Sequence, residues 1–390
     1  MYVKDGKIAR VTADDPEPAE RGVLLRPNQL LLPAATDLHV HLRDWNQAYK
    51  ETVESGTKAA LSGGITAIAE MPNTDPRLDT AENVRRRIKL LSEKSYADFA
   101  VHAGVPERVR ELERMQAAGS FAVKIYPEEM PRFREVAWVA QRLGMKITIH
   151  AEVSAMIGTS SEPLAEVESV KGLLPLVRRG MNIRFAHIST AAAAALINRK
   201  REEGFNTRME VTPHHLFMTR LLSESRIGLA SSVRPPLRSA GNVRRMRSLL
   251  RRSIFDFYAT DHAPHSRKEK STRKPAPGFT ALEFAFPLLL AREGPERACK
   301  LYCESPAKYL GIRKGLIERG YDADLVVFSK RNWVIHSSKF VSKGRVTPFE
   351  GDTLDYAVDL VFKAGRVAYE RNRFHKQSVR AILPTAKKGD

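Results

Sequence analysis

Residues 36–44 read TDLHVHLRD and place two histidines and an arginine at alternating positions. Side chains of a β-strand alternate between its two faces. We therefore expect Leu38 and Val40 to face surrounding helices, and His39 and His41 to face the opposite way together. Two imidazoles on one face of a strand can bind the same cation. A lone His-x-His pair is a weak signal, so its meaning depends on the fold around it.

From residue 34 onward, short apolar segments alternate with longer helical ones. The predicted strands are 34–41, 65–71, 97–103, 121–126, 146–150, 182–187, 207–212 and 254–260. The predicted helices are 52–62, 80–94, 106–118, 132–143, 163–179, 191–203, 241–252 and 279–292. Eight strands that are each followed by a helix predict an α/β fold, a (β/α)₈ TIM-type barrel. In such barrels the chemistry lies at the C-terminal ends of the strands.

Both ends of the chain predict a second, smaller unit. Residues 2–11 read YVKDGKIARV, which predicts a hairpin that turns at Asp5 and Gly6. After about residue 313 the chain is again rich in strand-like segments. We therefore predict a small β-sandwich domain from residues 1–33 and 314–390, beside a catalytic barrel over residues 34–313.

The composition excludes some classes of protein. No stretch approaches the ~18 apolar residues that span a bilayer, and the N-terminus lacks the apolar core of a signal peptide. We therefore expect a cytoplasmic protein without membrane contact. The two cysteines, Cys299 and Cys303, are too few for a disulfide framework or a thiolate zinc site. We interpret them as free, partly buried thiols.

The formal net charge of +19 indicates either solvated basic faces or an acidic partner. The basic runs at 83–91 and 242–253 predict amphipathic helices with outward charges. They contain no aromatic residues on which bases could stack, so we do not expect nucleic-acid binding. An acidic protein partner or a homo-oligomer remains open.

Other predicted strands also present polar side chains to the barrel mouth. In SFAVKIY, outward-facing Phe121, Val123 and Ile125 would leave Lys124 facing inward. His150, His187 and Asp261 end three further predicted strands. Together with the first histidine pair, these residues make a nitrogen and oxygen donor set without thiolates. Such a set predicts a divalent metal site, most simply for zinc, with cobalt, manganese and iron still open.

Lys124 is an unusual member of this set, because an ammonium repels a cation. Its neutral amine can add carbon dioxide to form a carbamate, which can bridge two cations about 3.5–4 Å apart. The alternative is an ordinary ammonium paired with a carboxylate such as Glu152. We favour the carbamate, because two cations would otherwise lack a bridging anion from the protein.

At this point the chain resembles a known family. The motifs are DLHVHLRD (37–44), MPNTDP (71–76), KIYPEE (124–129), IHAE (149–152), AHIST (186–190), EVTPHHLF (210–217), RPPLR (234–238) and TDHAPH (260–265). Their order is similar to that in dihydroorotases of the cyclic amidohydrolase superfamily, over about residues 33–370. The resemblance implies reversible cyclisation of N-carbamoyl-L-aspartate to L-dihydroorotate and water in pyrimidine (UMP) biosynthesis. It also implies a metal-bridging hydroxide and an aspartate that acts as general acid and base.

The resemblance assigns roles residue by residue. It implies two divalent ions held by His39, His41, a carbamylated Lys124, His150, His187 and Asp261, with Asp261 as the catalytic proton carrier. It implies substrate contacts from His41, Arg43, Asn73, His265, Pro277 and Gly278. Arg43 and Asn73 match the residues that hold the free carboxylate. His214 and His215 are interpreted as structural, and His102 and His262 have no supporting motif.

One position departs from the family pattern. The family usually has asparagine where this chain has Arg234, in RPPLR. An arginine cannot accept a hydrogen bond, but it can bind a carboxylate with two donors. Arg234 would either share in carboxylate recognition or turn out of the site.

Other assignments stay open on the sequence alone. An allantoinase or a dihydropyrimidinase (hydantoinase) would share the metal site, but its substrate lacks the carboxylate that suits Arg43 and Asn73. A non-catalytic assembly partner is a further alternative, although every ligand position is filled. The positive charge would also suit association with aspartate carbamoyltransferase, with which dihydroorotases form complexes.

Overall fold

The computed structural model describes residues 1–13 and 22–384. Its largest sheet has eight parallel strands, which follow one another in chain order. They are β4 (Ala35–Val40), β5 (Ile65–Glu70), β6 (Asp98–Ala103), β7 (Ser120–Ile125), β8 (Lys146–Ile149), β9 (Ile183–Phe185), β10 (Thr207–Val211) and β11 (Phe257–Tyr258). The first and last strands meet just beyond β11, where Val40 pairs with His262. The sheet therefore closes into the predicted barrel.

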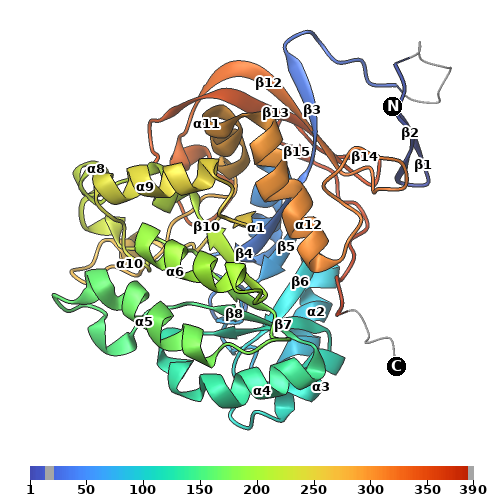
Figure 1. Cartoon of the computed structure of the whole chain (residues 1–390). Coiled ribbons are helices and arrows are strands. Elements are labelled where there is room, and N and C mark those ends of the chain that lie inside the picture. The colour runs from blue at the N-terminus through green and yellow to red at the C-terminus, as the bar shows by residue number, and fades with distance from the viewer. Residues whose placement is uncertain (14–21, 385–390) are drawn as a thin grey trace.

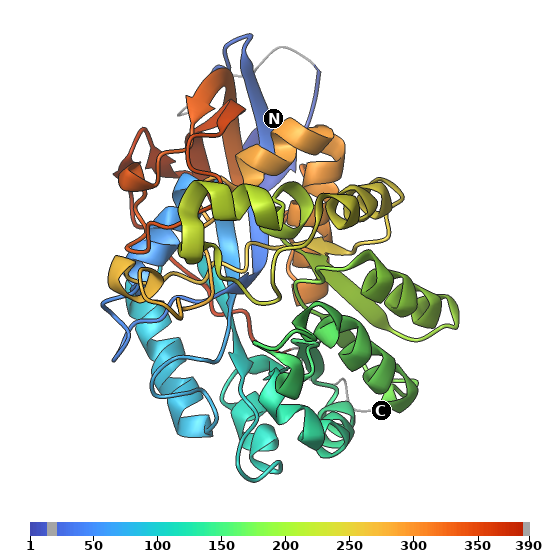
Figure 2. The same ribbon diagram turned by 90° about the vertical axis from the view of Figure 1, so that its left-hand side faces the viewer.

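Helices cover the outside of this barrel (Figure 1 and Figure 2). They are α1 (Val53–Ser62), α2 (Ala81–Lys94), α3 (Glu111–Ala117), α4 (Phe133–Leu143), α5 (Ala165–Leu173), α6 (Ala191–Glu202), α9 (Ala240–Arg251) and α11 (Ala285–Cys299). Shorter helices are α7 (Pro213–Phe217), α8 (Arg220–Ile227), α10 (Arg267–Lys270) and α12 (Ser305–Leu310). The predicted α/β barrel is thus confirmed. No helix in the described part of the chain is long and apolar enough to cross a membrane.

Several helix boundaries differ from the predicted ones. The helix predicted over 163–179 is helical only within α5, and 3₁₀ turns that contain Pro163 and Pro175 flank it. Proline lacks the amide hydrogen that would continue a helix, so this break has a local cause. The last predicted helix starts later than expected, because residues 276–284 form an irregular connection before α11.

The second sheet joins both ends of the chain, as predicted. Its antiparallel order is β15 (Arg373–Phe374), β14 (Arg366–Glu370), β13 (Thr353–Lys363), β12 (Leu325–Val334) and β3 (Gln29–Pro33). Figure 1 shows blue β3 beside the orange-red C-terminal strands. A separate hairpin of β1 (Tyr2–Lys4) and β2 (Lys7–Arg10) turns at Asp5 and Gly6. The exact domain limits stay a prediction, and residues 14–21 and 385–390 lie outside the described chain.

Strict alternation of faces does not hold along every strand. The β4–β5 register shifts between Asp37 and Val40, and Leu38 packs in a different apolar cluster from Val40. The prediction that Phe121 faces the outer helices is wrong. The β6–β7 register shifts beside it, and its ring lies 4.6 Å from that of His102. One extra residue in a strand reverses the faces that follow it, which explains both differences.

The two cysteines are free, as predicted. Cys303 is buried at the junction of the two sheets, and its thiol donates to the Pro33 carbonyl at 3.3 Å. Cys299 is partly buried.

Candidate active site

The predicted metal ligands lie at the C-terminal ends of five barrel strands. His39 belongs to β4, and His41 follows it; Lys124 belongs to β7. His150 follows β8, His187 follows β9 and Asp261 follows β11. All six side chains are buried in the described structure. The barrel topology therefore gathers residues that are up to 222 positions apart in the sequence, as counted from His39 to Asp261.

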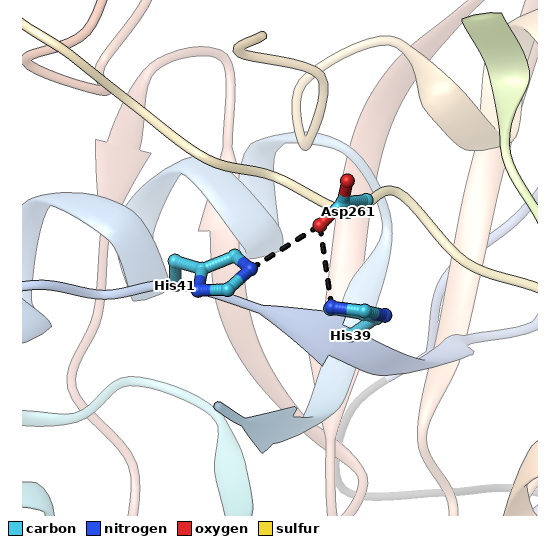
Figure 3. A group of neighbouring side chains, drawn as sticks. All are labelled: His39, His41 and Asp261. Atoms are coloured by element: carbon cyan, nitrogen blue, oxygen red, sulfur yellow. Dashed lines mark hydrogen bonds and ion pairs between the residues drawn. The ribbon is translucent and has the colours of Figure 1, made fainter. Parts of the chain in front are cut away.

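Three of these residues form a compact donor group. Asp261 Oδ1 lies 3.2 Å from Nε2 of both His39 and His41 (Figure 3). All three donor atoms lie within 4.8 Å of one another, which suits coordination of one ion.

Hydrogen bonds on the far sides of the rings set which nitrogen faces Asp261. The Nδ1–H of His39 donates to Glu210 Oε1 at 2.6 Å, and that of His41 donates to Asn73 Oδ1 at 2.6 Å. Burial keeps the pKa of both histidines well below the ordinary value, so both rings are neutral. Their Nε2 lone pairs therefore face the Asp261 carboxyl oxygen, and neither ring supplies a hydrogen to this contact. A divalent cation between these three acceptor atoms would replace their mutual repulsion by attraction. The residues therefore fit a metal ion.

The second histidine pair lies next to the first. The His187 ring is centred 5.1 Å from the His39 ring and 4.4 Å from the His150 ring. His150 Nε2 lies 2.6 Å from Glu152 Oε2, which orients its ring. The Nδ1 of His187 is buried and has no hydrogen-bond partner among the described residues. An unpartnered buried nitrogen of this kind is available to a metal ion.

Lys124 is fully buried, and its Nζ has no hydrogen-bond partner among the described residues. The alternative pairing with Glu152 is not present in the described structure, because Lys124 Nζ has no hydrogen-bond partner and Glu152 Oε2 accepts from His150. Burial lowers the pKa of Lys124 to about 7, so its neutral amine is accessible near neutral pH. After burial, the charge of Lys124 is the next cause of the low pKa of His39, which places the amine near the donor group.

Backbone strain marks the same region. His187 has a φ of 37° and Asp261 has a φ of 47°, in the left-handed region that most side chains disfavour. Arg43 has a φ of 55°. Strained residues of this kind cluster at functional sites, where the surrounding structure holds them. Burial also raises the pKa of the Asp261 carboxyl to about 7.

The predicted carboxylate-binding residues lie beside the donor group. Asn73 contacts His41, as described above. The Arg43 guanidinium is 6% exposed, and its Nη2 lies 3.5 Å from His265 Nε2. His265 Nε2 lies 3.0 Å from the Pro277 carbonyl, which can only accept, so this nitrogen carries the hydrogen. No carboxylate among the described residues forms an ion pair with Arg43.

Arg234 does not share this arrangement. Its Nη1 pairs with Glu162 Oε1 at 3.3 Å, and its side chain is 36% exposed. It lines a separate cavity of about 710 Å³ that contains none of the predicted metal ligands. Of the two outcomes that the sequence left open for Arg234, the structure therefore shows the outward orientation.

Two important residues were not identified from the sequence. Glu210, in β10, accepts from the His39 ring and also from the His187 backbone N–H at 3.1 Å. Arg184, in β9, is fully buried and holds the other carboxylate oxygen of Glu210 in an ion pair. A charged residue between two apolar neighbours in a barrel strand was the signal that could have identified both, because isolated buried charges are costly.

Three of the remaining buried histidines, His102, His215 and His262, have structural hydrogen-bond partners. His102 Nδ1 donates to the Glu70 carbonyl at 2.8 Å, and its Nε2 accepts from Arg184 at 2.9 Å. His215 contacts Thr212 Oγ1 at 2.8 Å and the Pro235 carbonyl at 3.0 Å. His262 accepts from the Ala281 backbone N–H at 3.2 Å.

Known proteins similar to this chain agree on its family. A family model described as the amidohydrolase family matches residues 30–368. A dihydroorotase from Anaeromyxobacter dehalogenans is 31% identical, over 96% of this chain and 94% of the relative. A dihydroorotase from Pelotomaculum thermopropionicum is 34% identical, over 95% and 94% respectively.

Solved structures show the same fold. An L-hydantoinase (dihydropyrimidinase) from Arthrobacter aurescens is 26% identical and superposes with a TM-score of 0.90, over 96% of this chain and 92% of that one. A D-hydantoinase from Thermus sp. is 23% identical with a TM-score of 0.87, over 98% and 95%, and supports the fold alone. The predicted resemblance is confirmed: the chain belongs to the amidohydrolase family and is a hydrolase.

Proposed function

We propose that this hydrolase is a dihydroorotase, which interconverts N-carbamoyl-L-aspartate and L-dihydroorotate. The observation that carries the proposal is the buried Arg43 guanidinium, which has no carboxylate partner among the described residues. A buried charge without a partner is costly, so it suits a site where the ligand supplies the opposite charge. L-Dihydroorotate carries such a carboxylate, and the dihydroorotase relatives support the same assignment.

The rival assignment is a hydantoinase or dihydropyrimidinase, and an allantoinase is a further one. The hydantoinase assignment is favoured by the high structural similarity to the Arthrobacter aurescens L-hydantoinase. A ring substrate without a carboxylate would leave Arg43 without a carboxylate partner in the complex. We therefore place this assignment second.

The proposed cofactors are two divalent ions, most simply Zn²⁺, and a carbamate on Lys124. His39, His41 and Asp261 would hold one ion, while His150 and His187 would hold the other. Lys124 would join the two sites through its carbamate oxygens. When bound, the ions would supply a strong nucleophile near neutral pH by lowering the pKa of water to about 7.

The side chains perform the remaining steps. Asp261 takes the proton of the attacking water and delivers it to the ring nitrogen as the cyclic amide opens. Arg43 and Asn73 hold the unreactive carboxylate, which orients the ring in the site. In the reverse direction Asp261 accepts the proton from the nitrogen that closes the ring. Closure consumes one proton overall, so low pH favours the cyclic product.

The direct test is turnover of L-dihydroorotate, followed by its ultraviolet absorbance with zinc-loaded protein. We expect consumption of L-dihydroorotate at alkaline pH and its formation from N-carbamoyl-L-aspartate at acidic pH. Replacement of Arg43 by Met should raise KM about 30- to 150-fold, since a charge-assisted hydrogen bond contributes about 2–3 kcal/mol. Exposed Arg244→Met is the matched control. Turnover of dihydrouracil, hydantoin or allantoin without L-dihydroorotate would establish the rival assignment.

Glu210 gives a second test, which measures metal binding. Glu210→Gln keeps the shape of the side chain but weakens its hold on the His39 ring. Loss of such a partner lowers metal affinity about 10- to 100-fold. Competition with a zinc-binding dye measures this affinity, and exposed Glu168→Gln serves as the control. Equal affinities of Glu210→Gln and the unaltered protein would contradict the role of Glu210.

Association with an aspartate carbamoyltransferase or between copies of this chain, and a cytoplasmic location, belong to the same proposal. The net charge of +19 supports an acidic partner.

A further inference from the structure

A buried lysine that takes no part in the proposed chemistry lies behind the loop next to His265. Lys270 ends the short helix α10, and only 2% of its surface is exposed. Its Nζ donates to three backbone carbonyls, those of Ser232 at 2.9 Å, Ala276 at 3.0 Å and Gly278 at 2.9 Å. The ammonium thus has all three of its hydrogens bound.

Lys270 is held by backbone groups alone. The neighbouring carboxylate of Glu269 pairs with Lys50 at 2.8 Å, and no carboxylate in the described part of the chain pairs with Lys270. Burial lowers the pKa of Lys270 to about 7, which shows that its charge is costly in this place. Three carbonyl acceptors offset that cost, so the ammonium and the loops stabilise one another.

The three carbonyls belong to two different segments. Ser232 precedes Arg234, whereas Ala276 and Gly278 lie on the loop after α10. The Gly278 N–H also donates to the Ser232 carbonyl, at 3.1 Å. Gly278 has a φ of 142°, and a Cβ there would lie 2.5 Å from the Ala263 carbonyl oxygen. Residues 276–278 are therefore hydrogen-bonded to the Ser232 segment and packed closely against Ala263, and Lys270 is the common donor of the Ser232 and 276–278 segments.

The backbone around Pro277 links Lys270 to the predicted substrate-binding residues. Lys270 holds the carbonyls on either side of Pro277, while the Pro277 carbonyl lies 3.0 Å from His265 Nε2. That nitrogen is in turn 3.5 Å from Arg43 Nη2. A series of contacts therefore leads from Lys270 through Pro277 to His265, and Arg43 lies beside the same His265 nitrogen without a hydrogen bond between these two donors.

We infer that Lys270 is a positioning residue for substrate binding. By holding residues 276–278, it sets the direction of the Pro277 carbonyl, the orientation of the His265 ring and thus the space beside Arg43 that receives the carboxylate end of the substrate. This inference rests on the proposed function for the identity of the substrate. Lys270 touches neither substrate nor reacting atoms, so it acts on affinity more than on the chemical step.

The experiment compares the zinc-loaded unaltered protein with Lys270→Met, which keeps the side-chain length and removes the donors. We expect KM for L-dihydroorotate to rise about 10-fold while kcat changes less than about 3-fold, the pattern of lost binding without lost chemistry. Hydrogen exchange should quicken in peptides that cover 271–279 and stay unchanged over 36–43. Lys268→Met, at an exposed position of the same helix, should behave like the unaltered protein.

A second variant keeps the inference testable if Lys270→Met does not fold. Lys270→Gln retains two donors and should show the same KM change at smaller size, with zinc content unaltered. A folded Lys270→Met with unchanged KM, or with reduced kcat at unchanged KM, would overturn the inference, as would failure of both variants to fold. Absence of L-dihydroorotate turnover in the unaltered protein would overturn the proposed function instead, and hydrogen exchange would still test the loop.

Discussion

Replacement of Lys124 by Ala is expected to lower kcat/KM for L-dihydroorotate about 10³-fold, equivalent to ~4 kcal/mol of transition-state stabilisation. The reason is the place of this residue in the structure. Its amine is fully buried, has no hydrogen-bond partner among the residues that the structure describes, and has a pKa lowered by burial to about 7. A neutral amine in this position can take up carbon dioxide and give the two proposed ions a shared anionic ligand.

The same variant offers a positive control. Short carboxylic acids such as acetate or propionate can enter the space left by the side chain and supply oxygen ligands. We expect them to restore part of the activity of Lys124→Ala and none to a variant with intact Lys124. Exposed Lys171→Ala should retain full activity. Mass spectrometry of the intact protein and metal analysis complete the test, and full activity of Lys124→Ala would exclude a bridging carbamate.

The barrel could be predicted because its pattern is repeated eight times along the chain. Each apolar strand ends close to the predicted position, since short runs such as 65–70 and 98–103 are bounded by helix-capping residues or loops. The C-terminal strands could be predicted from composition, whereas the strand β3, and not the predicted N-terminal hairpin, joins them in one sheet. Helix ends were less predictable, because Pro163 and Pro175 shorten α5 in a way that periodicity does not show.

The limits of prediction in the site have specific physical causes. A one-residue irregularity in β7 turns Phe121 toward His102, and no sequence pattern marks such a register shift. The orientation of Arg234 depends on a carboxylate, Glu162, that is 72 residues away. Sequence reasoning can name the charge of such a residue, but it cannot choose among distant partners.

Glu210 shows a different limit. It lies in the motif EVTPHHLF, in which the two histidines are the more evident metal-ligand candidates. The glutamate nevertheless holds His39 and the His187 backbone. The parity argument applied to this strand would have placed Glu210 inside the barrel, because its neighbours Met209 and Val211 pack in the outer apolar cluster.

Replacement of Asp261 by Asn is expected to lower kcat about 10²- to 10⁴-fold, the range contributed by general acid and base catalysis. The amide keeps the size of the side chain but can neither take a proton from water nor deliver one to the ring nitrogen. In the structure Oδ1 of Asp261 lies 3.2 Å from Nε2 of both His39 and His41, so the substitution also weakens one proposed metal ligand. Steady-state kinetics at saturating zinc should separate the two effects.

Loss of proton transfer is distinguished from loss of metal binding by measuring activity and zinc content in the same preparation. If Asp261 moves the proton, Asp261→Asn that contains the full complement of zinc will still be slow, and KM for L-dihydroorotate will change little because Arg43 and Asn73 are intact. If Asp261 were only a ligand, activity would return in proportion to added zinc. Asp355→Asn, at an exposed position of β13, controls for loss of charge. Recovery of full kcat by zinc alone would therefore remove Asp261 from the proton-transfer step and leave it as a ligand.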